Sequence, residues 1–288
     1  MSTQTSRTTA DAVPSQREHH RHAAQHTAPS GASLPRAVLA EWTKLRSLRS
    51  TWWTLVIALG LAVGFAALLA AVVSNPDGQQ PQGGPGANGL ADPVGIALAS
   101  STFSTLVLGV LGALVVAGEY ATGSISASLM ALPRRWPLVV AKVAVLVGLL
   151  VPFALVLSVA CLWVAGLVYG DAATIDWTAS ATWVAVLGNC AYLVTVALLG
   201  LGLGLLLRTT AAAITVLVAI VFVAPPLLTL VTWDWVVAIR DHLPDVAGAT
   251  LASTTGGTLG AGEAWLTLLA WAAVPVLAGA VVLQRRDA

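Results

Sequence analysis

The sequence predicts an all-α integral membrane protein with six transmembrane helices and both termini in the cytoplasm. Hydrophobic residues make up 57% of its 288 residues and charged residues only 9%, whereas a soluble domain carries about 25% charged residues. Six apolar runs are each long enough to cross about 30 Å of hydrocarbon. The cations are concentrated in every second connection between these runs. Together these observations favour a membrane-embedded helix bundle.

The composition also excludes some classes of function. A formal net charge of +1 does not provide a broad nucleic-acid-binding surface, so we expect no nucleic-acid partner. Cys161 and Cys190 lie inside apolar runs and lack the spacing of metal ligands. We therefore expect both cysteines to be small buried hydrophobic residues.

Residues 1–35 are rich in Ser, Thr, Gln, Ala and His and contain no apolar run. Such a segment cannot bury enough apolar surface to order itself, which predicts a disordered cytoplasmic tail. The tail contains four clustered histidines, but no cysteines or acidic partners at metal-ligand spacing accompany them: His19, His20, His22 and His26. The cluster therefore does not predict a metal site.

Residues 36–50 have the pattern of an amphipathic helix. Leu39, Trp42 and Leu45 recur at three-residue steps, and Lys44 and the neighbouring arginines lie off that stripe. This pattern predicts a helix that rests on the membrane surface with its cations among the lipid headgroups. The alternative is a plain positively charged flank to the first membrane span.

The six apolar runs form the predicted transmembrane domain, residues 51–288. The expected spans are 51–74, 94–117, 138–168, 181–207, 211–231 and 263–283. Their interiors contain no Asp, Glu, Arg or His. Lys142 lies near the start of the third span, where we expect its ammonium group to reach the headgroup region.

The orientation follows from the positive-inside rule. The tail and residues 36–50, the second-to-third connection with the adjoining helix start, and the ends of the fourth and sixth runs hold every Lys and Arg except Arg240. Both termini are therefore expected in the cytoplasm of a multi-pass plasma-membrane protein. The connection at 232–262 is the longest predicted outer loop, and its pattern favours a shallow re-entrant or interfacial helix.

The stretch from Gly118 to Lys142 holds most of the charge in the middle of the chain. It opens with helix-forming residues broken by two glycines, and it closes with a proline, two arginines and Trp136. Proline stops helices, and tryptophan and cations favour the membrane interface. We predict a cytoplasmic loop containing a short amphipathic segment that a soluble partner could push.

The same stretch resembles a known family. Glu-Tyr-x-x-Gly-Ser-Ile beginning at Glu119, followed by Leu-Pro-Arg-Arg and by Ala-Lys ending at Lys142, is similar to the first cytoplasmic loop of ABC-2-type transporter permeases. Glu-Trp-Thr-Lys beginning at Glu41 resembles the helix that leads into the membrane domain in actinobacterial members. The resemblance implies ABC-2 permease architecture, with this loop touching an ATPase subunit.

The resemblance also assigns candidate site residues. The expected ATPase-coupling loop comprises Gly118, Glu119, Tyr120, Thr122, Gly123, Ser124 and Ile125. The N-terminal amphipathic helix contributes Glu41, Trp42 and Lys44, and the inner-face charges are Arg134, Arg135 and Lys142. Glu119 is expected to pair with either the partner ATPase or the chain's own N-terminal amphipathic helix.

The chain is not expected to be an enzyme or to bind a cofactor of its own. A phosphate-binding loop requires lysine after glycine, in the pattern G-x-x-x-x-G-K-[ST]. The two lysines, Lys44 and Lys142, follow Thr43 and Ala141. ATP would therefore bind to a separate subunit. Because the span interiors offer neither catalytic groups nor buried acids, intramembrane catalysis and ion coupling are also not expected.

Gly200, Gly202 and Gly204 alternate with leucines inside the fourth run. They follow no strand and precede no ribose-binding acid, which argues against a dinucleotide site. Small residues let membrane helices approach closely, so we expect these glycines to pack against a neighbouring helix. Gly60 and Gly64 in the first span are expected to do the same.

The interpretation is the transmembrane permease subunit of an ATP-driven ABC-2-type exporter. It would move a hydrophobic or amphipathic substrate across the cytoplasmic membrane by using a separate ATPase subunit. The resemblance implies a second permease copy or paralogue, and membrane lipids surround the spans. Two alternatives stay open: a non-transporting membrane regulatory or assembly partner, and a passive channel, which the absence of repeated polar rings disfavours.

Overall fold

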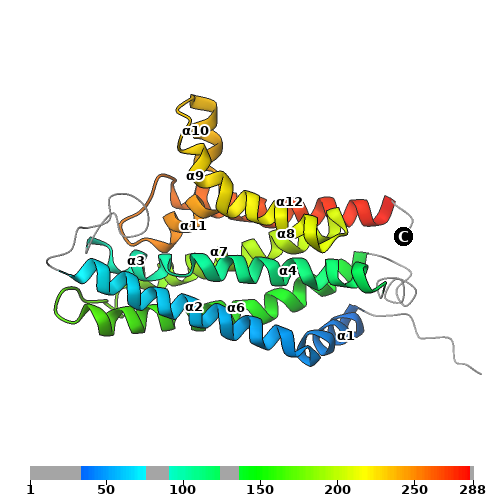
Figure 1. Cartoon of the computed structure of the whole chain (residues 1–288), viewed down its shortest axis with the longest axis horizontal. Coiled ribbons are helices and arrows are strands. Elements are labelled where there is room, and N and C mark those ends of the chain that lie inside the picture. The colour runs from blue at the N-terminus through cyan, green and yellow to red at the C-terminus, as the bar shows by residue number, and fades with distance from the viewer. Residues whose placement is uncertain (1–33, 76–90, 124–135, 286–288) are drawn as a thin grey trace, which may run out of the picture. The chain divides into compact units, whose positions relative to one another are not determined.

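The computed structural model describes residues 34–75, 91–123 and 136–285, and these residues form helices and their connections, with no strand among them (Figure 1). In chain order the helices are α1 (Leu34–Ser47), α2 (Arg49–Ser74), α3 (Pro93–Ala99), α4 (Thr102–Thr122), α6 (Trp136–Tyr169), α7 (Ser180–Leu207), α8 (Thr210–Val218), the π-helical η2 (Ala219–Val223), α9 (Ala224–Leu228), α10 (Asp234–Asp241), α11 (Pro244–Ala252) and α12 (Ala261–Arg285).

Six helical segments are long and apolar enough to cross a membrane, which confirms the predicted fold class. They are α2, α4, α6, α7, α12 and the continuous stretch Thr210–Leu228 that joins α8, η2 and α9. The second predicted span, 94–117, differs from the structure because it is broken into α3 and α4. At the break, the hydroxyl groups of Ser100 and Ser101 donate to the carbonyl oxygens of Ala97 and Leu98, as serines do when they compete for helix carbonyls.

The most buried of the six spans is α7, which packs against α4, α6, α11 and α12. Glycines allow this close packing. A Cβ atom at Gly112 of α4 would overlap the carbonyl oxygen of Ala197, and one at Gly200 of α7 would overlap that of Gly109. The expectation that Gly200, with its neighbouring glycines, packs against another helix is therefore confirmed.

The parallel expectation for the first span is wrong within the described part of the chain. A Cβ atom at Gly60 or Gly64 would meet nothing within 4 Å. Both glycines lie on an exposed stretch of α2. The pattern of small residues was correct for α7 because that helix is surrounded by other helices, whereas α2 is covered on one side only.

The fifth span, Thr210–Leu228, is the least buried of the six. Its helix changes to π geometry at η2, just before Pro225 and Pro226, which cannot donate backbone hydrogen bonds. After α9 the chain leaves the bundle, and α10 projects away from it (Figure 1). It then returns as α11, which packs against α7 and α12.

A buried polar cluster joins three helical segments inside the bundle. The side-chain amide of Asn189 on α7 donates to the hydroxyl of Ser158 on α6 at 2.9 Å. Its carbonyl accepts from Ser101, at the break before α4, also at 2.9 Å. Because polar groups in an apolar interior need partners, these bonds fix the mutual positions of the three segments.

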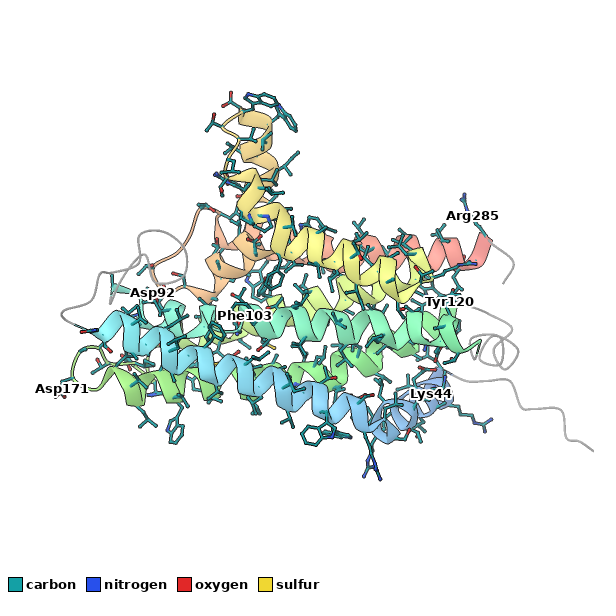
Figure 2. All side chains as sticks on the ribbon, viewed as in Figure 1. Lys44, Asp92, Phe103, Tyr120, Asp171 and Arg285 are labelled. Atoms are coloured by element: carbon teal, nitrogen blue, oxygen red, sulfur yellow. The ribbon has the colours of Figure 1, made fainter. Side chains whose placement is uncertain are left out.

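The two ends of the bundle differ in charge. Lys44, Tyr120 and Arg285 lie at one end, and Asp92 and Asp171 lie at the opposite end (Figure 2). The helix order places the described cations of α1, the start of α2 and the ends of α7 and α12 at the Lys44 end. This separation is the three-dimensional counterpart of the uneven cation distribution in the sequence.

Candidate functional site

The helix α1 is held against α6 at the Lys44 end of the bundle (Figure 1). Its buried residues are Ala37, Glu41 and Leu45, which recur every four residues and therefore share one helical face. Ala37 packs against Leu138 and Ala141 of α6. A glutamate thus lies at the centre of the face that α1 buries.

The apolar stripe that the sequence suggested for this helix is only partly buried. Leu45 is covered, whereas Leu39, Trp42 and Leu48 are exposed. Exposed apolar side chains next to Lys44 and Arg46 suit a helix at the membrane interface. The face that α1 buries is therefore different from the predicted apolar stripe. A search for periodic apolar residues does not find it, because its central residue is Glu41.

The candidate site is a cluster of four charged side chains from α1, α4 and α6. The ammonium nitrogen of Lys142 lies 2.8 Å from Oε2 of Glu41 and 2.8 Å from Oε1 of Glu119. The ammonium nitrogen of Lys44 lies 2.8 Å from Oε1 of Glu41 and 3.0 Å from Oε1 of Glu119. Each carboxylate therefore bridges both lysines, and we call this set the four-charge cluster.

Lys142 is the most deeply placed member of the four-charge cluster. Its side chain is 2% exposed, and its ammonium group also donates to the carbonyl oxygen of Val115 at 3.4 Å. The expectation that Lys142 extends to the lipid headgroups is therefore wrong. Two carboxylates inside the bundle provide a stronger attraction than the headgroup region because the surrounding dielectric is low.

The charges in the cluster shift the pKa values of the α1 residues. Burial alone would raise the pKa of Glu41, but the charge of Lys142 and the hydrogen bonds from both lysines lower it below its ordinary value. Burial would lower the pKa of Lys44, but its hydrogen bonds with Glu41 and Glu119 raise it. Both groups therefore stay ionised at neutral pH.

Glu119 has one carboxylate oxygen that the cluster does not use. Oε1 accepts from both lysines, whereas Oε2 is buried and has no hydrogen-bond partner among the described residues. The next residue, Tyr120, lies beneath the guanidinium group of Arg208, whose carbon is 5.5 Å from the ring centroid. The C-terminal ends of α4 and α7 are thus joined by a cation–π contact beside the cluster.

Arg208 itself was not identified as a site residue from the sequence. It ends α7 in the left-handed conformation, with φ of 57°, and is the one non-glycine residue with positive φ in the described ranges. Its Nε and Nη2 atoms are buried and make no hydrogen bond with the part of the chain that the structure describes. In sequence it looked like a topology-setting cation, and no pattern pointed to its contact with Tyr120.

The structure places several predicted coupling-loop residues inside a helix. Gly118, Glu119, Tyr120 and Thr122 belong to the last turns of α4, and Gly123 ends that helix with φ of 70°. The predicted loop start at Gly118 was therefore too early. Four other predicted site residues lie outside the described residues: Ser124, Ile125, Arg134 and Arg135.

A second polar site closes the opposite end of the bundle. The carboxylate of Asp92 caps α3 by accepting from the amide of Gly95 at 2.9 Å. It also accepts from the hydroxyl groups of Ser253 and Thr254, just after α11. Although burial would raise the pKa of Asp92, these hydrogen bonds lower it. Asp92 therefore fastens the start of α3 to the end of α11.

The arrangement around Lys142 has a mechanical consequence. The helix α1 is tied through Glu41 and Lys44 to two membrane spans at once. Because removing one member of a buried ion pair leaves an uncompensated charge, α1 cannot move away from α4 and α6 without a large cost. A displacement of α1 or of the end of α4 is therefore transmitted to the spans.

Comparison with known families gives one match. The family model described as "ABC-2 family transporter protein" matches residues 37–232, a range that includes all four members of the four-charge cluster and Arg208. A search of curated proteins gives no significant match.

Proposed function

The chain belongs to the ABC-2 family of transporter proteins and is a membrane subunit of a transporter, and we propose that it works as the permease of an ATP-driven exporter. In this proposal a separate ATPase subunit binds and hydrolyses ATP. The permease moves a hydrophobic or amphipathic substrate across the cytoplasmic membrane. A second permease copy or a paralogue completes the transmembrane pathway.

The observation that carries this proposal is the attachment of α1 to α4 and α6 through the four-charge cluster. An ATPase on the cytoplasmic side needs a rigid structure to push against, and the cluster makes α1 and the inner end of α4 move with the spans. Glu119 lies near the end of α4 and is itself one of the predicted coupling-loop residues. In the proposal, force applied to that loop therefore reaches Glu119 and the cluster first.

The proposed orientation places the Lys44 end of the bundle in the cytoplasm. It rests on the positive-inside rule applied to the cations at that end. Arg240 on α10 is the described cation that lies apart from them. This orientation puts the four-charge cluster on the side where ATP is available, as the proposal requires.

The proposal is tested by identifying what binds to the full-length chain. The tagged protein is purified in mild detergent, with and without prior crosslinking in the membrane, and companions are identified by mass spectrometry. We expect a near-stoichiometric companion with the phosphate-binding pattern G-x-x-x-x-G-K-[ST]. Absence of any such companion after crosslinking would contradict the proposal and favour a non-transporting role.

A further inference from the structure

The helix α11 lies deep beside α7. A Cβ atom at Gly248 of α11 would meet the ring of Tyr192, and Gly188 of α7 lies against Leu251. Rising residue numbers on α11 thus pair with falling numbers on α7, so the two helices run antiparallel. The re-entrant or interfacial helix predicted between 232 and 262 therefore takes the re-entrant form in α11, and it lies deeper than predicted because glycines allow it to dock along α7.

This register places Asp245 near mid-membrane. At about 1.5 Å per residue, Gly188 lies about 12 Å and Tyr192 about 18 Å from the start of α7. Asp245 precedes Gly248 by one helical turn, so it lies about 22 Å along α7, a helix about 42 Å long. The six apolar runs contain no acid in their interiors, but they do not include every residue that lies at the depth of the spans. Asp245 belongs to a predicted outer loop and nevertheless lies beside the middle of α7.

The carboxylate of Asp245 is incompletely satisfied. The backbone amides of Asp245 and Val246 support it from the start of α11. Its Oδ1 atom is buried and has no hydrogen-bond partner, and no Lys, Arg or His among the described residues forms an ion pair with it. An ionisable group at this depth is costly, which is why such groups usually have a functional role.

One aromatic side chain, Tyr192, lies near this carboxylate, and three phenylalanine rings form a row on other helices. Tyr192, only 7% exposed, packs against α11 and feels the charge of Asp245, and a hydrogen bond joins it to Thr105. Two residues before Thr105, the ring of Phe103 lies 4.4 Å from Phe65 and 6.3 Å from Phe222, centroid to centroid. Figure 2 shows Phe103 between Asp92 and Tyr120 along the bundle.

The Phe222 ring also contacts the apolar cluster to which Tyr192 belongs. The same cluster contains Ala247, which lies on α11 two residues from Asp245. A carboxylate beside a tyrosine ring in an apolar interior suits an organic cation, because the carboxylate neutralises the charge and the ring face attracts it.

We propose that Asp245 binds the positively charged group of a hydrophobic cargo, with the ring of Tyr192 beside it. This inference rests on the proposed transport function and narrows its substrate class to hydrophobic cations such as amines. In the conformation described here the carboxylate oxygen is covered. The cargo reaches it when the α11–α7 contact opens during transport.

The test uses two probes of similar size and opposite charge, tetraphenylphosphonium and tetraphenylborate. The full-length chain is purified with whatever companion it retains, placed in nanodiscs of neutral lipid, and titrated with each probe. We expect saturable binding of the phosphonium and none of the borate. Asp245→Asn should weaken phosphonium binding about tenfold, which corresponds to about 1.4 kcal/mol, and Asp245→Glu should retain it within a few-fold.

The control is Asp234→Asn, because Asp234 also lies in the first turn of a short helix but is exposed on α10. This variant should bind the phosphonium like the wild type. Equal binding by wild type and Asp245→Asn, or equal binding of both probes, would overturn the inference. The result is independent of the ATPase: a chain that retains an ATPase but shows no Asp245-dependent binding contradicts only this inference.

Discussion

The ammonium group of Lys142 lies 2.8 Å from the carboxylate of Glu41, although the two residues are 101 positions apart in the chain. This contact joins α1 to the third membrane span. The same ammonium group also contacts Glu119 at 2.8 Å, so Lys142 is the most deeply buried of the residues that connect all three helices.

Replacing Lys142 should strongly destabilise the fold. In Lys142→Met, Glu41 and Glu119 lose the buried ammonium group that balances their negative charge. Breaking a buried ion pair in this way costs about 3–5 kcal/mol of folding free energy. The measurement is the thermal unfolding midpoint of the purified chain in detergent. Lys44→Met is the matched control, because its side chain is 46% exposed and its loss should cost much less. Equal losses for the two variants would contradict the central position of Lys142.

The glycines between α4 and α7 give a second prediction. Gly200→Ala introduces a Cβ atom that overlaps the backbone of α4, and such overpacking costs about 1–3 kcal/mol. Gly60→Ala is the control, since the structure shows open space at that position. Thermal unfolding midpoints in detergent should fall for the first variant and stay unchanged or rise for the second. A lower midpoint for Gly60→Ala would indicate that α2 packs against another chain there.

The Asp92 contact predicts a dependence of stability on acid. Because hydrogen bonds lower the pKa of Asp92 in the folded protein, its stabilising contribution is present above the ordinary aspartate pKa of about 3.9 and is lost as the pH falls through the lowered value. Asp92→Asn should therefore be less stable at neutral pH, by about 1.5–3 kcal/mol.

The measurement for Asp92 compares thermal unfolding midpoints at neutral and acidic pH. The wild-type midpoint should fall more on acidification than that of Asp92→Asn. Asp171→Asn, an exposed aspartate at the same end of the bundle, should follow the wild type at both pH values. If Asp92→Asn and the wild type lost the same stability in acid, the contact with Ser253 and Thr254 would not act as described.

Asp245→Asn should raise stability while it weakens cation binding. The variant replaces a half-buried charge that has no ion-pair partner among the described residues with a neutral group of the same shape, and such uncompensated charges are costly. We expect a higher thermal unfolding midpoint in detergent than for the wild type. A lower midpoint would indicate that the carboxylate of Asp245 stabilises the fold, as the carboxylate of Asp92 does, and does not serve to bind a cargo.

The sequence predicted the membrane spans well because hydropathy and span length are local properties. The break between α3 and α4 was missed because Ser100 and Ser101 are small residues within an apolar run, and only their hydrogen bonds show where the helix ends. The depth of α11 along α7 was also not predicted. Asp245 and its neighbours look like an outer loop until the glycine contacts with α7 bring the helix into the membrane region.

The candidate site was predicted in part. The sequence predicts all four members of the cluster as site residues: Glu41, Lys44, Glu119 and Lys142. A contact between Glu119 and the N-terminal amphipathic helix is one of the two predicted pairings of Glu119. Their convergence on Lys142 depends on how α1 folds back onto α6, which is a long-range contact that residue patterns do not encode. Arg208 was counted only among the cations because nothing in its neighbourhood in sequence indicates that it lies over Tyr120.

The most direct test of the coupling role is the rate of ATP hydrolysis by the reconstituted complex of the full-length chain and its ATPase. Glu119→Gln keeps the shape of the side chain but weakens its contacts with both lysines. If the four-charge cluster transmits movement between the ATPase and the spans, hydrolysis should fall about tenfold, within the usual range of coupling energies, while the complex still assembles. Glu263→Gln, an exposed carboxylate on α12, should hydrolyse ATP like the wild type. An unchanged rate in Glu119→Gln would contradict the coupling role of the cluster.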